Sequence, residues 1–128
     1  MFQDQKVIEK QREIIDRRVL LASFEKMASW SGISNKNRSD VLKVFKKSLI
    51  SGNNEIRRRF EFDRVSGSYT VRAHAFLIDQ LVRVLFDVTA NYVYPAPNPT
   101  IGEQISVVAT GGYGRGELAP FSDIDLMF

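Results

Sequence analysis

Apolar residues recur at helical spacing along the first 94 residues of the chain and at the shorter spacing of strands after that. Between Lys6 and Trp30 they recur at mostly helical spacing, which is typical of an amphipathic helix. The Gly- and Ser-containing run 31–35 predicts the end of this helix, because such residues favour caps and turns. The apolar positions of this helix are Val7, Ile8, Ile14, Ile15, Leu21, Phe24 and Ala28.

A second helix is predicted from Ser39, which can serve as its N-cap, with Asp40 in the first turn, where a negative charge suits the helix dipole. The triplet 52–54, Gly-Asn-Asn, is expected to kink or split this helix, and the run 65–68 to close it. Its apolar positions are Val41, Leu42, Phe45, Leu49 and Ile56.

The third predicted helix, Tyr69 to Tyr92, has the most regular pattern. Two apolar stripes form one broad face, so we expect this helix to be buried on most sides. His74 lies on it without a cluster of other metal ligands nearby in sequence, and we interpret it as a helix-face histidine. The apolar stripes are Val71, Ala75, Ile78, Val82 and Leu85, and Leu77, Leu81, Val84 and Val88. The polar stripe is Arg72, Asp79, Arg83 and Asp87, with ion pairs expected at 79/83 and 83/87.

Three prolines between Tyr94 and Thr100 stop any helix and predict an extended connector. After it the β-branched run Ile105–Ala109 predicts a strand, and Asp123–Phe128 predicts a second one. Between them, the sequence predicts a loop or short helix followed by a turn. The pattern therefore predicts an α+β chain with a helical region at 1–94, a connector at 95–104 and the start of a mixed domain at 105–128.

The composition excludes several kinds of metal site and redox chemistry. The 128 residues include no Cys and one His, which excludes disulfides, thiolate zinc sites, iron–sulfur sites, a cysteine nucleophile and any site built from several histidines. No stretch approaches the roughly 18 apolar residues that span a bilayer, and the N-terminus lacks the apolar core of a secretory signal. We therefore expect a cytoplasmic protein without a membrane partner.

The net charge is unevenly distributed. The chain holds 18 Lys and Arg against 15 Asp and Glu, a formal net charge of +3, but residues 1–64 carry +6 and residues 65–128 carry −3. The densest basic cluster is Arg57-Arg58-Arg59, and consecutive residues on a helix point in three directions. It also lacks the interleaved aromatics with which single-strand binders stack bases. We therefore do not expect a nucleic-acid partner.

Two features of the C-terminal part carry candidate chemistry. Asp123 and Asp125 alternate along the second predicted strand, so both carboxylates are expected on one face, with Ile124 and Leu126 pointing into a core. Carboxylate oxygens select Mg²⁺ or Mn²⁺ rather than zinc. The Gly111-Gly112 turn follows the first strand, and exposed N–H groups at such a turn bind phosphate oxygens.

Each feature is weak alone, because paired surface acids and glycine-rich hairpin loops are both common. Their order along the chain is more specific: a strand, Gly-Gly, a short segment, and then Ser-Asp-x-Asp on a second strand. It would bring a triphosphate cradle beside a metal-binding carboxylate pair, the arrangement that in-line nucleotidyl transfer needs.

The run Gly-Gly-Tyr-Gly-Arg-Gly-Glu-Leu-Ala-Pro-Phe-Ser-Asp-Ile-Asp-Leu, residues 111–126, strongly resembles the signature of the bacterial PII uridylyltransferase/uridylyl-removing enzymes. These belong to the DNA polymerase β-like nucleotidyltransferases. Residues 57–60 and 94–100 are also similar to that family. The resemblance implies a polymerase β-like nucleotidyltransferase domain after the helices, with the N-terminal helix as the least diagnostic part.

The resemblance further implies the reaction: UMP moves from UTP to a tyrosine of the PII nitrogen-signalling protein. It implies that Asp123 and Asp125 hold Mg²⁺, and that Gly111 and Gly112 give the phosphates room and backbone donors. It implies weaker roles for Ser122 as a phosphate contact and Arg115 as a charge neutraliser. For Arg115, an ion pair with Glu117 or another acid is an equal alternative.

Parts that the family uses are absent from these 128 residues. They are a third carboxylate on a later strand, the His-Asp hydrolase domain that removes UMP, and the regulatory domains that sense glutamine. We therefore expect an N-terminal fragment with an incomplete sheet, inactive in transfer by itself. Two alternatives stay open: a related glutamine synthetase adenylyltransferase-type enzyme, and a non-catalytic interaction fragment.

Overall fold

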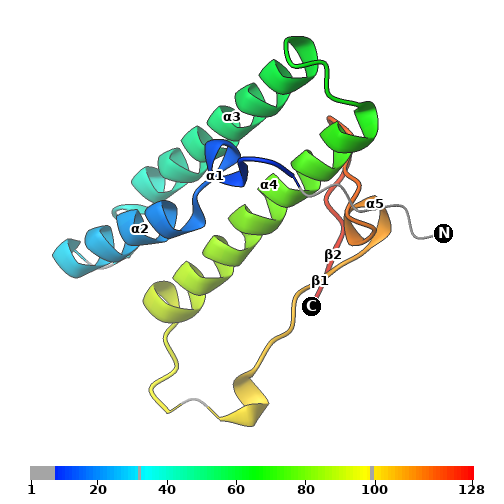
Figure 1. Ribbon diagram of the computed structural model, residues 1–128. Coiled ribbons are helices and arrows are strands. Elements are labelled where there is room, and N and C mark those ends of the chain that lie inside the picture. The colour runs from blue at the N-terminus through cyan, green and yellow to red at the C-terminus, as the bar shows by residue number, and fades with distance from the viewer. Residues whose placement is uncertain (1–7, 32, 99) are drawn as a thin grey trace.

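The computed structural model describes residues 8–31, 33–98 and 100–128 as a helical bundle with a small two-stranded sheet beside it (Figure 1). The N-terminal positions Lys6 and Val7, Gly32 at the end of the first predicted helix, and Pro99 of the connector lie outside the described residues. The architecture agrees with the predicted α+β class: helices first, then strands. Within the described residues, no helix is long and apolar enough to cross a bilayer.

The first predicted helix is in fact two helices, α1 (Gln11–Ile14) and α2 (Arg17–Ser31). Ile15 between them is extended, with φ −159° and ψ 133°. The carboxylate of Asp16 accepts a hydrogen bond of 3.0 Å from the Arg18 N–H, so it satisfies a free donor at the start of α2. Ile14, the last residue of α1, and Ile15 in the break are both buried in the main core.

Helix α3 (Arg38–Glu61) runs through the Gly-Asn-Asn triplet without a break, so the expected kink or split at 52–54 was wrong. Gly52 is buried at a helix crossing. A Cβ there would lie 2.5 Å from Leu77 Cδ1 and 3.1 Å from the Ile14 carbonyl oxygen, so the glycine permits close approach of three segments. The cap is Asn37 rather than the predicted Ser39.

Helix α4 (Gly67–Val88) agrees closely with the predicted third helix. The Ser66 hydroxyl accepts a 3.1 Å hydrogen bond from the Tyr69 N–H, and a π-helical turn, Thr89–Val93, continues the helix to the connector. Leu85 was expected on the buried face but is 51% exposed. Of the two predicted ion pairs on α4, Arg83 forms the one with Asp79, at 2.8 Å, in the described part of the chain.

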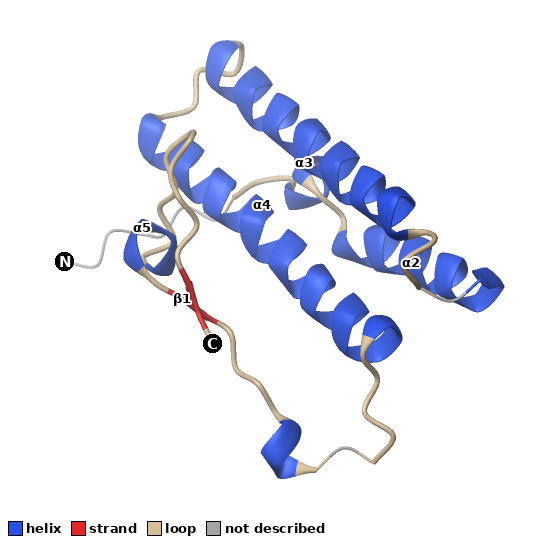
Figure 2. Ribbon diagram, turned by 180° about the vertical axis from the view of Figure 1, so that it is seen from behind, coloured by secondary structure: helices blue, strands red, loops and turns tan. Residues whose placement is uncertain are grey.

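The main core lies between α2, α3 and α4, with α1 closing one side (Figure 2). Phe24 of α2 stacks on Phe45 of α3, with ring centroids 4.8 Å apart. The buried members of this core are Ile14, Ile15, Leu20, Phe24, Ile56, Ala73, Leu77, Leu81, Val84 and Val88.

The C-terminal part leaves the bundle and returns to α4. The connector contains a 3₁₀ turn, Ile101–Glu103, and leads to β1 (Val108–Ala109), the short helix α5 (Gly111–Gly114) and β2 (Leu126–Met127). Both strands are shorter than the predicted 105–109 and 123–128, because each has only the other as a described partner. The predicted short helix after the Gly-Gly turn is present as α5.

Candidate functional site

The antiparallel pairing of β1 and β2 brings the two halves of the glycine–aspartate motif together. Val108 is opposite Met127 and Ala109 is opposite Leu126. One further hydrogen bond, 3.0 Å from the Thr110 N–H to the Asp125 carbonyl, extends this ladder toward the glycine turn. The turn and the second aspartate of the motif therefore meet at the same end of the sheet.

The carboxylate of Asp125 lies directly against Gly111, the first residue of α5. A Cβ at Gly111 would be 2.5 Å from Asp125 Oδ2, and the glycine has φ +59°, a left-handed conformation that other residues rarely adopt. The left-handed backbone favours glycine here, and any side chain at this position would have to displace the Asp125 carboxylate.

The next glycines of the motif are constrained by the chain's own backbone. A Cβ at Gly112 would approach the Glu117 carbonyl oxygen to 3.0 Å, and one at Gly114 would approach the Ala109 carbonyl oxygen to 2.7 Å. Gly112 was predicted to give phosphates room, and the structure adds a packing reason for it. The glycine-rich loop is therefore folded tightly on itself and on β1.

The glycine-rich loop packs against helix α4. Tyr113 and Leu118 are both about 95% buried and pack with Ala75 in a second, smaller core. The Leu118 N–H also donates a 3.0 Å hydrogen bond to the Val71 carbonyl. Burial, together with the negative charge of Asp79, raises the pKa of the Tyr113 hydroxyl.

Sequence reasoning named no supporting role for Tyr113 and Leu118. A signal was present, since an aromatic and an aliphatic residue within a stretch rich in glycine and charge need an apolar partner. The predicted apolar stripe on α4 supplies that partner in Ala75.

Both aspartates precede β2 rather than lying within it, so the predicted strand placement of the pair was wrong. Their side chains are exposed, and within the described residues neither carboxylate forms a hydrogen bond or an ion pair. Ile124 was expected in a core but is 45% exposed, whereas Leu126 packs against the second core as predicted. The two carboxylates are thus free to bind a ligand.

Arg115 and Ser122, the weaker nucleotide-binding candidates, are both exposed. The Arg115 guanidinium lies beside Gly112, whose Cβ would be 3.7 Å from Nη2. Among the described residues Arg115 forms no ion pair with Glu117 or any other acid. The ion pair that was the alternative to a nucleotide-binding role is therefore not observed. Ser122 lies in a tight turn, where its N–H donates to the Ala119 carbonyl at 3.1 Å.

A complete metal site is not assembled in this part of the protein. No group of three or more His, Asp or Glu side chains that could hold an ion occurs among residues 8–31, 33–98 and 100–128. Asp123 and Asp125 supply two carboxylates of the hard-oxygen type that Mg²⁺ accepts. His74 is partly buried on α4, away from other candidate ligands, and its burial lowers its pKa.

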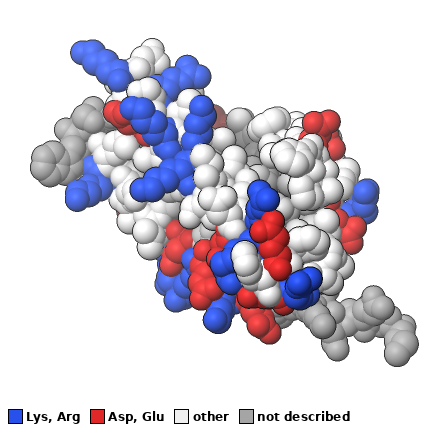
Figure 3. Space-filling view, turned by 90° about the horizontal axis from the view of Figure 1, so that it is seen from above, with Lys and Arg blue, Asp and Glu red and all other residues white. Residues whose placement is uncertain are grey.

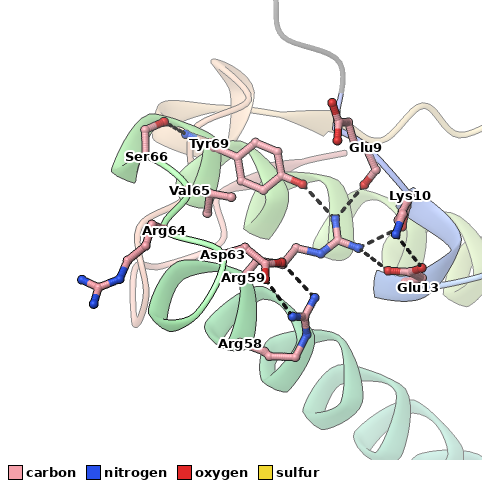
Figure 4. Close-up of a pocket in the computed structure, with 10 residues that line it drawn as sticks. All are labelled: Glu9, Lys10, Glu13, Arg58, Arg59, Asp63, Arg64, Val65, Ser66 and Tyr69. Carbon is pink, nitrogen blue, oxygen red and sulfur yellow. Dashed lines mark hydrogen bonds and ion pairs between the residues drawn. The ribbon is translucent and has the colours of Figure 1, made fainter.

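A separate cavity of about 830 Å³ lies where α1, the end of α3 and the start of α4 meet (Figure 4). Its centre is Arg59, which is only 4% exposed. The Arg59 guanidinium donates to Glu55, to Tyr69 Oη, to Glu13 and to the carbonyls of Glu9 and Lys10, at 2.6–3.2 Å. These bonds use all five of its N–H groups. The cluster is therefore a structural connection between three helices.

The other two arginines of the triplet are paired as well. Arg57 bonds Glu61 at 2.7 Å, and Arg58 bonds both Glu55 and Asp63 at 2.9–3.1 Å. Each of the three guanidinium groups is paired with an acid, but Arg58 and Arg59 share Glu55, so the prediction that the three point in different directions was wrong for this pair. Figure 3 shows red and blue atoms alternating over this half of α3. In the described part of the chain, the arginine triplet therefore offers no unpaired cation to a partner.

The chain is similar in sequence to several bacterial proteins. The chain is 43% identical over 121 residues to a protein of Rhodospirillum rubrum, 47% over 122 residues to one of Erythrobacter litoralis, and 46% over 121 residues to one of Azospirillum brasilense. Each of these is a bifunctional uridylyltransferase/uridylyl-removing enzyme, which confirms the resemblance predicted from the motif.

Each alignment takes in 94% of this chain but only 13% of the relative's length. The similarity thus extends through the helices as well as the glycine–aspartate motif. No family model and no solved structure matches the chain.

Proposed function

We propose that this chain is part of a bifunctional uridylyltransferase/uridylyl-removing enzyme and contributes to its nucleotidyl-transfer site. The observation that carries the proposal is the contact between Asp125 and Gly111, because it joins the carboxylate half of the motif to the glycine half. The identity of 43–47% to enzymes of that name supports it.

The proposed reaction transfers UMP from UTP to a tyrosine of the PII signal protein. The tyrosine oxygen forms a bond to the α-phosphorus of UTP, the bond from that phosphorus to the bridging oxygen breaks, and pyrophosphate leaves. The hydroxyl proton is lost to solvent or to a base. Because both the attacking and the leaving oxygens carry charge, the site must balance negative charge at the α-phosphate.

The residues present supply two of the ligands that a magnesium ion needs. Asp123 and Asp125 are exposed carboxylates free of other partners in the described part of the chain, and the Asp125 carboxylate occupies the space that a side chain at residue 111 would fill. Mg²⁺, when bound, would neutralise charge on the phosphoryl oxygens. Two carboxylates are fewer than a site of this class uses, so we assign a third to residues beyond these 128.

The other motif residues have supporting roles in this proposal. Gly111 and Gly112 let the backbone approach the phosphates closely, and the unpaired Arg115 guanidinium beside Gly112 can bind a phosphate oxygen. Ser122, in the turn just before Asp123, is a further phosphate contact. We assign UMP removal and glutamine sensing to other parts of the longer protein.

The test is transfer by the longer protein that contains this chain. Radiolabelled UTP with Mg²⁺ and PII should label PII on tyrosine, and ATP should not replace UTP. In a parallel assay with glutamine synthetase as the acceptor, labelling from ATP would instead favour the adenylyltransferase-type alternative. Absence of transfer from either nucleotide, with PII and the protein both folded, would favour a non-catalytic interaction fragment.

A further inference from the structure

We propose that the outer face of the first half of α3 binds an acidic protein segment that also carries apolar side chains. The face is formed by Ser39, Leu42, Lys43, Lys46, Lys47 and Ile50, all exposed. We call it the lysine face. It lies at the far end of the bundle from α5, so a partner bound there leaves the glycine–aspartate site open (Figures 1 and 2).

The charge of the protein is concentrated around this face. Residues 36–47 hold five Lys or Arg and one Asp, a net charge of +4, although the whole chain carries +3. Residues 55–63, the other half of α3, hold three of each sign and are neutral. Figure 3 shows the contrast: Lys and Arg gather over the end of the bundle where α2 and α3 meet, with few acids among them.

Most of the cations around this face have no ion pair, whereas the arginines in the second half of α3 are all paired. Lys43 bonds Asp40 at 3.0 Å, but within the described residues Lys46 and Lys47 have no ion pair. Lys36 and Arg38, beside the start of α3, likewise have none there. By contrast, Arg57, Arg58 and Arg59 each bond an acid.

This arrangement works against the helix itself. Lys43 and Lys47 are a like-charge pair one turn apart, which disfavours a helix by a few tenths of a kcal/mol. Arg38 is the first residue of α3, where the helix dipole disfavours a cation. Such local conflicts recur at functional sites, because a bound partner relieves them. An acidic partner on the lysine face would relieve the repulsion between Lys43 and Lys47.

Two exposed aliphatic side chains define what else the partner carries. Leu42 is 52% exposed and Ile50 is 59% exposed. They are eight residues apart on one helix, which corresponds to a separation of about 12 Å along its axis. Lys46 lies between them on the same face. A helix or extended segment with two apolar residues at that separation and carboxylates around them matches both features.

A protein segment fits this face better than other anions do. A nucleic-acid backbone would leave Leu42 and Ile50 against phosphates, and no aromatic residue is present for bases to stack on. The residues of α3 that could enter a lipid interface are mostly turned inward, since Val41, Val44, Phe45 and Leu49 pack against the core. Leu42 and Ile50 alone offer little area for membrane insertion.

The experiment uses a synthetic helical peptide with two Leu residues eight positions apart among Glu residues, titrated into the ¹⁵N-labelled chain at physiological salt. Amide shift changes should map to residues 36–50. K46E should weaken the peptide's affinity at least tenfold, and a peptide with one Glu changed to Lys should restore much of it. R64E is the matched control, since Arg64 is also exposed and free of ion pairs in the described part, and it should change the affinity less than threefold.

Three results would overturn the proposal. The first is equal weakening by R64E and K46E, which would indicate a diffuse charge effect. The second is unchanged affinity when both Leu residues of the peptide become Ser, which would remove the apolar part of the claim. The third is tighter binding of a DNA duplex or of phosphatidylserine vesicles to the same face, which would assign it to another class of partner.

Discussion

The carboxylate of Asp125 lies against the α-carbon of Gly111 at the first turn of α5, so closely that a Cβ there would be 2.5 Å from Oδ2. The contact depends on the antiparallel pairing of β1 with β2 and on the left-handed backbone of Gly111. The loop that carries Gly111 depends in turn on Tyr113 and Leu118, which are buried against α4. A short sheet and one helix thus fix the geometry of the proposed transfer site.

Replacing Gly111 by Ala should abolish most UMP transfer by the longer enzyme. The new Cβ would displace the Asp125 carboxylate, and the left-handed conformation would cost an additional 1 kcal/mol or so. Initial rates with UTP and PII measure the effect. Gly67→Ala is the control, because a Cβ at Gly67 meets nothing within 4 Å and the residue lies at the start of α4. Equal rates for the two variants would show that the Asp125 contact does not matter.

Tyr113 should act through its buried ring. Tyr113→Phe keeps the packing against Ala75 and should retain near wild-type transfer, with the raised pKa of the hydroxyl of no consequence at neutral pH. Tyr113→Ala leaves a cavity worth about 3–5 kcal/mol and should raise KM for UTP while the helices stay folded by circular dichroism. Tyr94→Ala, at a side chain 78% exposed, is the control and should behave as wild type. Loss of activity in Tyr113→Phe would instead give the hydroxyl a direct role.

Arg59 should be among the most sensitive positions for stability. Arg59→Met removes a buried guanidinium with five hydrogen bonds, and Glu55 keeps only its bonds from Arg58, so we expect a cost of about 1.5–3 kcal/mol. Urea denaturation measures the change. Arg57→Met loses only the exposed pair with Glu61 and should cost less than about 1 kcal/mol. Similar costs at the two positions would contradict a structural role for the Arg59 cluster.

Acid should destabilise the bundle through Glu55. Hydrogen bonds from Arg58, and then from Arg59, lower the pKa of Glu55 from 4.5 to about 2. A lowered pKa in the folded state means that the stabilisation is complete above pH 4.5 and is lost as the pH falls toward 2. The free energy of unfolding, measured between pH 6 and 2, should therefore fall less steeply in Glu55→Gln. Parallel slopes for wild type and variant would show that Glu55 is not a source of the acid sensitivity.

The sequence predicted where helices form more accurately than it predicted where they are interrupted. Regular apolar spacing identified α4 almost to its ends, because a helix buried along one broad face repeats its pattern without interruption. The break at Ile15 and the continuity at Gly52 both depend on long-range packing: Gly52 fits against Leu77, a residue far along the chain. Propensity indicates that glycine interrupts a helix, and only the crossing of α3 with α4 shows why it does not here.

The sequence identified the residues of the candidate site more accurately than it predicted their arrangement. Alternation along a strand placed Asp123 and Asp125 on one face, but the ladder begins at Leu126, because β1 offers only two residues for pairing. The order of strand, Gly-Gly and Ser-Asp-x-Asp predicted that the glycine turn lies beside the carboxylates, but it did not predict the direct contact of Asp125 with Gly111. The support from Tyr113 and Leu118 was present in the sequence as apolar residues within a polar loop, and the apolar face of α4 could have identified their partner.

The central claim is that Asp123 and Asp125 serve UMP transfer and no other activity of the longer protein. Asp123→Asn and Asp125→Asn keep the size of the side chain and remove the charge that would hold Mg²⁺. Asp87→Asn, an acid of α4 outside the motif, is the matched control.

The decisive measurement is a pair of assays on each folded variant, one for UMP transfer to PII and one for UMP removal from modified PII. We predict that each motif variant loses transfer by at least about a hundredfold and keeps removal, while Asp87→Asn keeps both. Near wild-type transfer in both motif variants would contradict the account.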